Sequence, residues 1–288
     1  MTAGRGLGWR LDYAWRAAAT GFCFAVFGIV SLVAGVTLFP LLCLTTRDAD
    51  VARKRAQALT HRWFGLFSRL MAATRAIRYE IHGAERLRQP GVMIVANHPS
   101  LIDVVLLLGY LPEVDCIMKQ AIFDNPFMRR PATWLGYIAQ ASPEQLFADA
   151  QAALRKNHSL LVFPEGTRTV PGRPIRMAHG AARMAVEAGA TILPVSIRVT
   201  PPHLFKHEPW WRPPVTCPHY VLTVGKPYAA SDFLRDADGV PSVAARRLTR
   251  HWEQYFAETT GGTAAHPLAE RAAETHYSQA DEAWPRKS

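Results

Sequence analysis

The sequence predicts an α/β fold, with a largely parallel central sheet flanked by helices, preceded by an N-terminal membrane helix and an amphipathic helix. From residue 78 onward, short apolar runs rich in β-branched residues alternate with helical segments, which is typical of a parallel sheet. Before them, residues 17–46 carry no charge. The predicted divisions are a flank (1–16), a membrane-anchoring segment (17–46), a basic amphipathic helix (47–77), the α/β domain (78–259) and a partly disordered tail (260–288).

The uncharged segment is long enough to enter a membrane, because about 20 apolar residues span a bilayer. A cleaved signal peptide has an apolar core of only about 7–15 residues, so we expect a retained anchor. Pro40 is expected to kink this helix, and a helix that enters the membrane without fully crossing it stays an alternative. More basic residues follow the segment than precede it, which favours the cytoplasm for its C-terminal side.

The helix that follows is predicted from residues 52–75, where Leu59, Trp63 and Phe67 recur at helical spacing beside arginines and a lysine. A basic amphipathic helix can lie on an anionic membrane surface, or it can pack its apolar face on the domain or on the preceding helix. The net charge of +10 indicates a negatively charged partner. Since the chain has no nucleic-acid-binding signature, we expect anionic lipid and no nucleic acid.

The α/β domain is predicted from the order of its elements. Strands are expected at 78–82, 92–96, 114–118, 160–163, 191–198 and 220–224. Helices are expected at 100–109, 143–157, 180–188 and 241–259, the third of them capped by Gly189. Residues 201–214 are expected to form a long loop whose Trp210 and Trp211 lie at lipid headgroup level or pack on the domain.

The most informative pair of residues is His98 and Asp103. The strand at 92–96 runs into Asn97, His98 and Pro99, and Asp103 lies one turn into the following helix. A carboxylate there can accept a hydrogen bond from one imidazole nitrogen and leave the other free to take a proton. Taken alone, the pair is equally consistent with a helix cap, because the helix dipole favours an acidic residue in the first turn.

A second polar loop, Pro164 to Thr169, follows the strand at 160–163. A loop of this kind at a strand end is typical of a ligand-binding edge in an α/β sheet. Arg168 offers a planar fork for a phosphate or carboxylate. Glu165 can accept hydrogen bonds from substrate hydroxyls or pair with Arg168, and the latter would make the loop an ordinary surface turn.

Together the two loops resemble the glycerolipid acyltransferase family, the group similar to lysophosphatidic acid acyltransferases. Its Asn-His-x-x-x-x-Asp signature is met from Asn97 to Asp103, and its Phe-Pro-Glu-Gly-Thr-Arg signature from Phe163 to Arg168. A further signature is partly met by residues 119–127, and a later strand contains Pro194, as in the family. The resemblance covers roughly residues 75–228, and two ordered motifs are far more specific than either alone.

The resemblance implies a membrane-bound acyltransferase. His98, oriented by Asp103, would remove the proton from a hydroxyl of a lysophospholipid such as 1-acylglycerol 3-phosphate. That oxygen would attack the thioester of acyl-CoA or an acyl-carrier protein. Substrate-binding residues are expected to be Asn97, Lys119, Glu165, Gly166, Thr167 and Arg168, with Pro164 and Pro194 as structural or acyl-pocket residues. Backbone N–H groups near Gly166 would stabilise the oxyanion.

No metal or organic cofactor is expected for this reaction. The family resemblance and the charge distribution favour a bacterial inner membrane, with the catalytic domain on the cytoplasmic side. The four cysteines have no metal-ligand spacing, and they are expected to be free thiols in a reducing compartment.

Two departures from the family concern the acceptor. Members that act on glycerol phosphates usually carry an arginine in the stretch that corresponds to 137–143, and this chain has none there. Residues 177–180 also replace a Phe-Lys pair. Possible cationic replacements are Arg129, Arg130, Arg173 and Arg176. A different lysolipid, or an amphiphile from a specialised pathway, is therefore an alternative acceptor.

Two other functional classes remain as alternatives. A membrane-tethered hydrolase is disfavoured because the chain lacks Gly-x-Ser-x-Gly and His-x-x-x-His spacing. An inactive lipid-binding protein with the same fold is disfavoured because His98, Asp103, Glu165 and Arg168 are all present.

Overall fold

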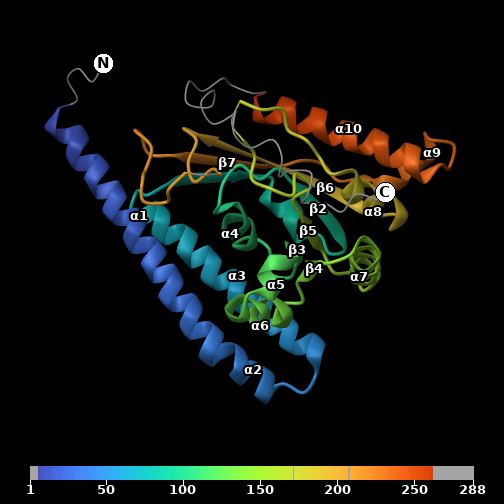
Figure 1. The fold of residues 1–288 in the computed structure, drawn as a ribbon, viewed down its shortest axis with the longest axis horizontal. Coiled ribbons are helices and arrows are strands. Elements are labelled where there is room, and N and C mark those ends of the chain that lie inside the picture. The colour runs from blue at the N-terminus through green and yellow to red at the C-terminus, as the bar shows by residue number, and fades with distance from the viewer. Residues whose placement is uncertain (1–5, 171, 207, 262–288) are drawn as a thin grey trace.

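The computed structural model describes residues 6–170, 172–206 and 208–261, and the predicted tail lies almost entirely outside them. One eight-stranded sheet forms the centre, in the order β1-β7-β6-β2-β5-β3-β4, with β8 pairing β6 (Figure 1). The strands are β1 (Arg78–His82), β2 (Val92–Ala96), β3 (Asp115–Lys119), β4 (Ile138–Gln140), β5 (Leu160–Val162), β6 (Thr191–Thr200), β7 (His219–Val224) and β8 (Tyr228–Ala229). Strands β6, β2, β5, β3 and β4 run parallel, which confirms the predicted fold class.

Helices cover both faces of this sheet. They are α1 (Leu7–Val33), α2 (Phe39–Thr45), α3 (Ala49–Ala73), α4 (Asp103–Leu108), α5 (Gln120–Asp124), α6 (Pro126–Trp134), α7 (Pro143–Arg155), α8 (His179–Glu187), α9 (Ala230–Arg235) and α10 (Pro241–Thr260). A π-helical turn, Ala34–Leu38, joins α1 to α2, and a 3₁₀ turn spans Ala84–Arg88. In Figure 1, α10 lies on one side of the sheet, and α3 and α1 lie on the other.

The alternation of side chains along β2 explains the two layers. Val92, Ile94 and Ala96 face the core shared with α3 and α4, whereas Met93 and Val95 face the core shared with α7, α8 and α10. All five residues are at most 3% exposed. A strand buried on both faces reads as a continuous apolar run, which is why this strand was predictable with its exact bounds.

Helix α1 differs from the prediction in where it begins. It starts at Leu7, ten residues before the predicted segment, and it includes Arg10, Asp12 and Arg16. The Arg16 side chain is fully buried, because Nε donates to Asp12 Oδ2 (2.8 Å) and the two Nη atoms donate to the carbonyls of Pro214 and Val215 (2.7 and 2.9 Å). Charges that looked like the boundary of an apolar segment are thus paired inside a longer helix. The π-helical turn lies directly before Pro40, where a kink was expected.

Helix α3 packs on the α/β domain, one of the two arrangements considered from the sequence. Phe67 and Met71 are each 1% exposed within the core, and Phe27 of α1 lies 4.7 Å from Phe67, centroid to centroid. On its polar side, Arg53 does not face outward as a basic membrane-facing residue would. Its Nη1 donates to Asp115 Oδ1 at 2.7 Å.

Asp115, at the start of β3, is the centre of a buried polar cluster. Its carboxylate also accepts from Gln57 Nε2 (2.9 Å) and pairs with His158 Nδ1 (3.1 Å). Arg53 Nη2 contacts His158 Nε2 at 2.7 Å. Because Arg53 can only donate, Nε2 of His158 accepts and Nδ1 carries the proton. The cluster fastens α3 to the edge of the sheet.

Several predicted boundaries are wrong, and each has a local cause. The helix expected at 100–109 begins only at Asp103, because Leu101 N–H donates to Leu204 O across the fold and does not enter a helical turn. The strand expected at 114–118 lies one residue later, because Val114 N–H donates to the Gln57 side chain. Strands β4 and β8 were missed, since runs of three and two residues carry no usable periodicity. Cys23, Cys116 and Cys217 are free, as expected.

Candidate active site

His98 follows β2 directly, and its imidazole is bonded to Asp103. Nδ1 lies 3.0 Å from Asp103 Oδ2, and the side chains are 19% and 0% exposed. In the described part of the chain, Nε2 of His98 has no hydrogen-bond partner. The ring packs on Phe163 at a centroid distance of 4.5 Å. The imidazole thus has one nitrogen fixed by a carboxylate and the other open, as the sequence predicted.

The Asp103 carboxylate sits in an apolar setting. Oδ2 also accepts from the Ser100 N–H at 2.6 Å, and Oδ1 is buried without a partner among the described residues. Burial raises the pKa of Asp103, while the hydrogen bond from His98 and the His98 charge act in the opposite direction. The carboxylate therefore depends on His98 for much of its stabilisation, which couples the two groups.

Glu165 joins the second loop to the first. Its Oε1 accepts from the backbone N–H of His98 (2.8 Å) and from the Thr169 hydroxyl (2.7 Å). The Thr169 N–H in turn donates to the His98 carbonyl (2.7 Å). Glu165 does not pair with Arg168, so the interpretation of this loop as a surface turn with an ion pair is wrong. Instead, the loop clamps the backbone of the histidine.

We expect Glu165→Gln to remove a pH dependence of stability. Burial raises the pKa of Glu165 from its ordinary value of 4.5 to about 7. The folded state then binds more protons than the unfolded state between these values, so ionisation destabilises the fold as pH rises through them. Glutamine keeps an oxygen acceptor and carries no charge. Denaturant unfolding at pH 5 and pH 8 gives the free energy of unfolding of both proteins. From pH 5 to pH 8, the stability of the variant relative to the wild type should rise by at most about 3 kcal/mol. An equal difference at both pH values would contradict this.

A buried hydroxyl network lies behind the dyad. The Ser100 hydroxyl is 2.9 Å from the Tyr220 hydroxyl, which is 3.0 Å from Nδ1 of His203. All three residues are at most 1% exposed. Burial lowers the pKa of His203 to about 4, with a smaller contribution from Arg16, so this imidazole is neutral. Because Ser100 also donates its N–H to Asp103, the network holds the turn that carries the carboxylate.

We expect Tyr220→Phe to destabilise the fold by about 1–3 kcal/mol, because two buried polar groups, on Ser100 and His203, lose their partner. Tyr13→Phe is a suitable control, since the Tyr13 hydroxyl has no hydrogen bond in the described structure and its ring stacks on Trp9. Chemical denaturation of both variants gives the comparison. A Tyr220→Phe variant as stable as Tyr13→Phe would show that the hydroxyl network contributes nothing.

Asn97 was predicted to bind substrate, but its side chain is already occupied. Nδ2 donates to the Ile197 carbonyl (2.8 Å), Oδ1 accepts from the Ile197 N–H (2.7 Å), and the residue is 1% exposed. It therefore joins the end of β2 to β6. Pro194 lies within β6, opposite Val95, and its carbonyl accepts from the Gly225 N–H at 2.8 Å. Pro164 is buried and its carbonyl accepts from Ala178 N–H.

Arg168 reaches a segment that the sequence did not connect with the site. Its Nη1 donates to the carbonyls of Leu204 (2.9 Å) and Phe205 (3.2 Å), in the loop predicted at 201–214. The same loop packs Trp210 on Phe24 of α1, with centroids 5.5 Å apart. Trp210 therefore packs one side of its ring on α1, while it stays 43% exposed and Trp211 60% exposed. The loop connects α1 to the catalytic edge.

The remaining predicted residues lie along the same carboxyl edge. Gly166 has a φ of +63°, a conformation suited to glycine, and its N–H donates to the Phe163 carbonyl. Its own N–H is thus not available for an oxyanion. The N–H groups of Thr167 and Arg168 have no acceptor in the described structure. Lys119 ends β3 and is exposed.

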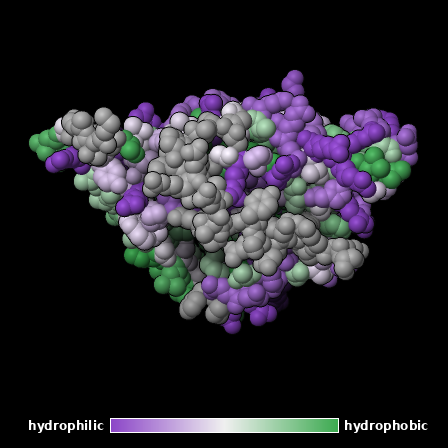
Figure 2. Space-filling view, turned by 45° about the horizontal axis from the view of Figure 1, so that its top comes forward, coloured by the Kyte–Doolittle hydropathy of each residue, from purple (hydrophilic) through white to green (hydrophobic). Residues whose placement is uncertain are grey.

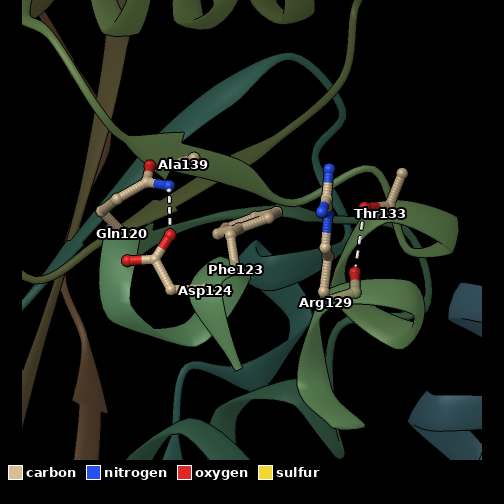
Figure 3. A pocket seen from close by; sticks show the side chains of 6 residues that line it. All are labelled: Gln120, Phe123, Asp124, Arg129, Thr133 and Ala139. Atoms are coloured by element: carbon tan, nitrogen blue, oxygen red, sulfur yellow. Dashed lines mark hydrogen bonds between the residues drawn. The ribbon is translucent and has the colours of Figure 1, made fainter. Parts of the chain in front are cut away.

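A cavity of about 520 Å³ opens beside this edge, at α5, α6 and β4 (Figure 3). Its lining residues are Gln120, Phe123, Asp124, Arg129, Thr133 and Ala139. Gln120 Nε2 donates to Asp124 Oδ1 at 3.0 Å, and Phe123 lies between these residues and Arg129 in Figure 3. Neither His98 nor Asp103 lines this cavity, so it is separate from the immediate surroundings of the dyad.

The arginines considered as replacements for the one absent from residues 137–143 lie in different parts of the fold. Arg129 lines the cavity. Arg176 pairs with Glu253 of α10 at 3.8 Å, away from that cavity. Arg130 is exposed on α6. No group of three or more metal-binding side chains is found in the residues that the structure describes.

Sequence reasoning missed Tyr220, His203 and the Leu204–Lys206 segment as parts of the site. Tyr220 belongs to an ordinary apolar strand, and its hydroxyl meets Ser100 only through the pairing of β7 with β6. The histidine at 203 in a proline-rich loop was the available signal, since a buried polar side chain needs partners.

The chain is similar to known acyltransferases. Residues 78–198 match the family model "Acyltransferase". A 1-acyl-sn-glycerol-3-phosphate acyltransferase of Pseudomonas aeruginosa is 27% identical over 150 residues, which cover 50% of this chain and 58% of that protein. A lyso-ornithine lipid O-acyltransferase of the same organism is 33% identical over 180 residues, 59% of this chain and 64% of that protein. The chain therefore spans about three fifths of these curated relatives.

The fold also has a solved counterpart. The crystal structure of the 1-acyl-sn-glycerophosphate acyltransferase PlsC from Thermotoga maritima has a TM-score of 0.67 to this chain at 21% identity. The match covers 88% of this chain and all of that one. At this identity the likeness establishes the fold.

Proposed function

We propose that the chain is a member of the glycerolipid acyltransferase family, which its similarity to acyltransferases over residues 78–198 supports. In this proposal it moves a fatty acyl group from acyl-CoA or an acyl-carrier protein to the free hydroxyl of a lysophospholipid such as 1-acylglycerol 3-phosphate. The observation that carries this proposal is the dyad. His98 Nδ1 is held by a fully buried carboxylate while Nε2 stays open, which is the arrangement a general base needs.

That geometry supports the following reaction. Nε2 of His98 takes the hydroxyl proton as the acceptor oxygen bonds to the thioester carbonyl carbon. The tetrahedral oxyanion then collapses, the carbon–sulfur bond breaks, and the thiolate receives the proton from His98. Asp103 stabilises the imidazolium between these steps. We assign the oxyanion to the N–H groups of Thr167 and Arg168, because that of Gly166 is bonded to Phe163.

We further propose that the protein acts at a membrane surface through α1. One helical segment, Leu7–Leu42, is long and apolar enough to cross a membrane, with a mean hydropathy of 2.4 in its most apolar window, of which only 11% is buried. A core helix would be mostly buried. The outward side of the Leu7–Leu42 segment exposes Leu11, Trp15, Phe22, Ile29 and Val36. Figure 2 shows apolar residues along one edge of the molecule.

The packing of α1 favours an orientation along the membrane. Arg16 binds the 214–215 segment and Phe39 stacks on Trp134, with centroids 5.7 Å apart. Residues 16 and 39 are separated by roughly 35 Å at the rise of an α-helix, while the hydrocarbon core is about 30 Å thick. A helix crossing the bilayer upright would pull the α/β domain into it. We therefore favour entry without full crossing, at a cytoplasmic membrane face.

The acceptor has a second candidate class. The arginine expected at 137–143 is absent, and the relative with 33% identity is named for a lyso-ornithine lipid, not for a glycerol phosphate. A lysolipid with a different head group is the alternative substrate.

The test is an acceptor panel with the full chain in detergent. Labelled palmitoyl-CoA and a palmitoyl-carrier protein are each offered with 1-acylglycerol 3-phosphate, a lyso-ornithine lipid and other lysolipids. We expect transfer to at least one acceptor, with release of one thiol per acyl group. Thioester hydrolysis without transfer would support a hydrolase. Lysolipid binding without turnover would support an inactive lipid-binding protein. Either result would overturn the proposal.

A further inference from the structure

A short turn before α4 holds Asp103, and two neighbouring residues of that turn are fastened from outside it. Ser100 donates its N–H to Asp103 Oδ2, and its hydroxyl meets the Tyr220 hydroxyl at 2.9 Å. The next N–H, that of Leu101, donates to the Leu204 carbonyl at 3.1 Å. Helix α4 begins only at Asp103, so the turn lies outside the helix and depends on such contacts.

The Tyr220 hydroxyl is itself held in place by His203. Nδ1 of His203 lies 3.0 Å from it, and both side chains are at most 1% exposed. Tyr220 belongs to β7, which pairs with β6, whereas His203 lies in the loop after β6. A buried hydroxyl with two partners has little freedom to move. Its position is therefore set by strand pairing on one side and by the loop on the other.

The network can reach the base only through Asp103. In the part of the chain that the structure describes, neither Tyr220 nor His203 bonds to His98. Asp103 Oδ2, however, accepts from the Ser100 N–H at 2.6 Å and lies 3.0 Å from Nδ1 of His98. A shift of the Ser100 turn would therefore move the same oxygen that orients the imidazole.

We propose that Tyr220 and His203 are positioning residues for acyl transfer, which hold the Ser100 turn so that the Asp103 carboxylate stays aimed at His98. This inference rests on the proposed function. It adds that the orientation of the base is set from β7 and from the loop after β6, outside the two family signatures. A network that served folding alone would change the amount of folded protein and leave the kinetics of each folded molecule unchanged.

The test compares Tyr220→Phe and Ser100→Ala with a control, Tyr255→Phe, in the full chain in detergent. The first two variants each remove the bond between the two hydroxyls and leave the Ser100 N–H in place. Tyr255 lies on α10, and its hydroxyl has no hydrogen bond in the described structure. We expect the first two variants to lower kcat roughly tenfold, the size of one net hydrogen bond, with little change in KM. The control should keep the wild-type values.

Two further variants test whether these side chains act as one unit. Since Ser100→Ala and Tyr220→Phe lose the same bond, the double variant should be about as active as the single ones. His203→Leu should lower kcat as Tyr220→Phe does. His203→Asn, whose amide keeps a hydrogen-bonding group near the place of Nδ1, should restore most of the rate. Multiplied losses in the double variant, or a wild-type kcat in His203→Leu, would overturn the inference.

The pH dependence of kcat separates positioning from folding. A protonated imidazole cannot accept the hydroxyl proton, and the charge of Asp103 favours that protonated form. If the carboxylate drifts away, the acidic limb of the pH–rate profile should move to lower pH, by roughly half a unit. Glu165 and Arg168 lie near the dyad, and Glu208 and Arg16 near the network, but these groups are the same in every variant. A lower plateau with an unmoved limb would contradict positioning.

A measurement without turnover separates this inference from the proposed function. Nuclear magnetic resonance of isotope-labelled histidine follows the protonation of His98 in the full chain, and His98→Ala identifies its signals. If the wild type transfers no acyl group, a titration of His98 that moves to lower pH in Tyr220→Phe, but not in Tyr255→Phe, still supports positioning. The same titration of His98 in the wild type and in Tyr220→Phe would overturn it.

Discussion

His98→Ala should lower the rate of acyl transfer by about 10²–10⁴-fold, the usual contribution of a positioned general base. The side chain is 19% exposed, and in the described structure its one hydrogen bond is to Asp103, so its removal should lower stability at that buried carboxylate while the overall fold is kept. Asp103→Asn should be comparably inactive. The amide oxygen can still accept from the Ser100 N–H and Nδ1, but it carries no negative charge, so the imidazolium that forms on proton transfer loses its stabilisation.

The measurement is thiol release from palmitoyl-CoA at saturating acceptor, with circular dichroism to verify folding. His82→Ala is the matched control, because His82 is an exposed histidine at the end of β1. The control should keep the wild-type rate. A folded His98→Ala variant within about threefold of the wild type would refute the assignment of the base.

Asp115→Ala is expected to destabilise the fold by about 3–5 kcal/mol, the range for removing one partner of a buried ion pair. The Asp115 side chain is 5% exposed and bonds Arg53, Gln57 and His158. Its loss would leave the Arg53 guanidinium, 11% exposed, without a counterion between α3 and the sheet. The midpoint of denaturant unfolding in detergent measures the loss.

Glu113→Ala provides a control from the same turn. Glu113 pairs with Lys54, the neighbour of Arg53, at 3.5 Å, and both side chains are about half exposed (55% and 51%). An exposed pair contributes at most about 1 kcal/mol. Similar losses for the Asp115 and Glu113 variants would show that burial of the cluster has no energetic importance.

The local sequence was sufficient to predict the contact between His98 and Asp103 and the positions of most strands. His98 and Asp103 are five residues apart, so one strand end and one helical turn place them together, and β2 is apolar along its whole length. The hydroxyl network could not be predicted in the same way. Tyr220 lies 120 residues from Ser100, and only the topology of the sheet brings them into contact.

Arg16 and Arg53 show the same limit in the N-terminal helices. From the sequence alone, both side chains are expected to face solvent or lipid headgroups, because charged groups are rarely buried. Arg16 is instead fully buried against the 214–215 segment. Arg53 is 11% exposed and pairs with Asp115. Each finds its partners in another part of the chain, and such partners have no signature in a local pattern.

The clamp formed by Asn97 means that two separate parts of the fold hold the dyad. Asn97 fixes the end of β2 to Ile197 by two bonds, and His98 is the next residue. His98 is therefore positioned from the interior of the sheet, while the loop at 201–214 supports its partner Asp103 from outside, through His203 and Tyr220 and through the Leu204 carbonyl that accepts from Leu101 N–H. A change in that loop therefore reaches the turn that carries Asp103, and the loop cannot be exchanged without affecting the dyad.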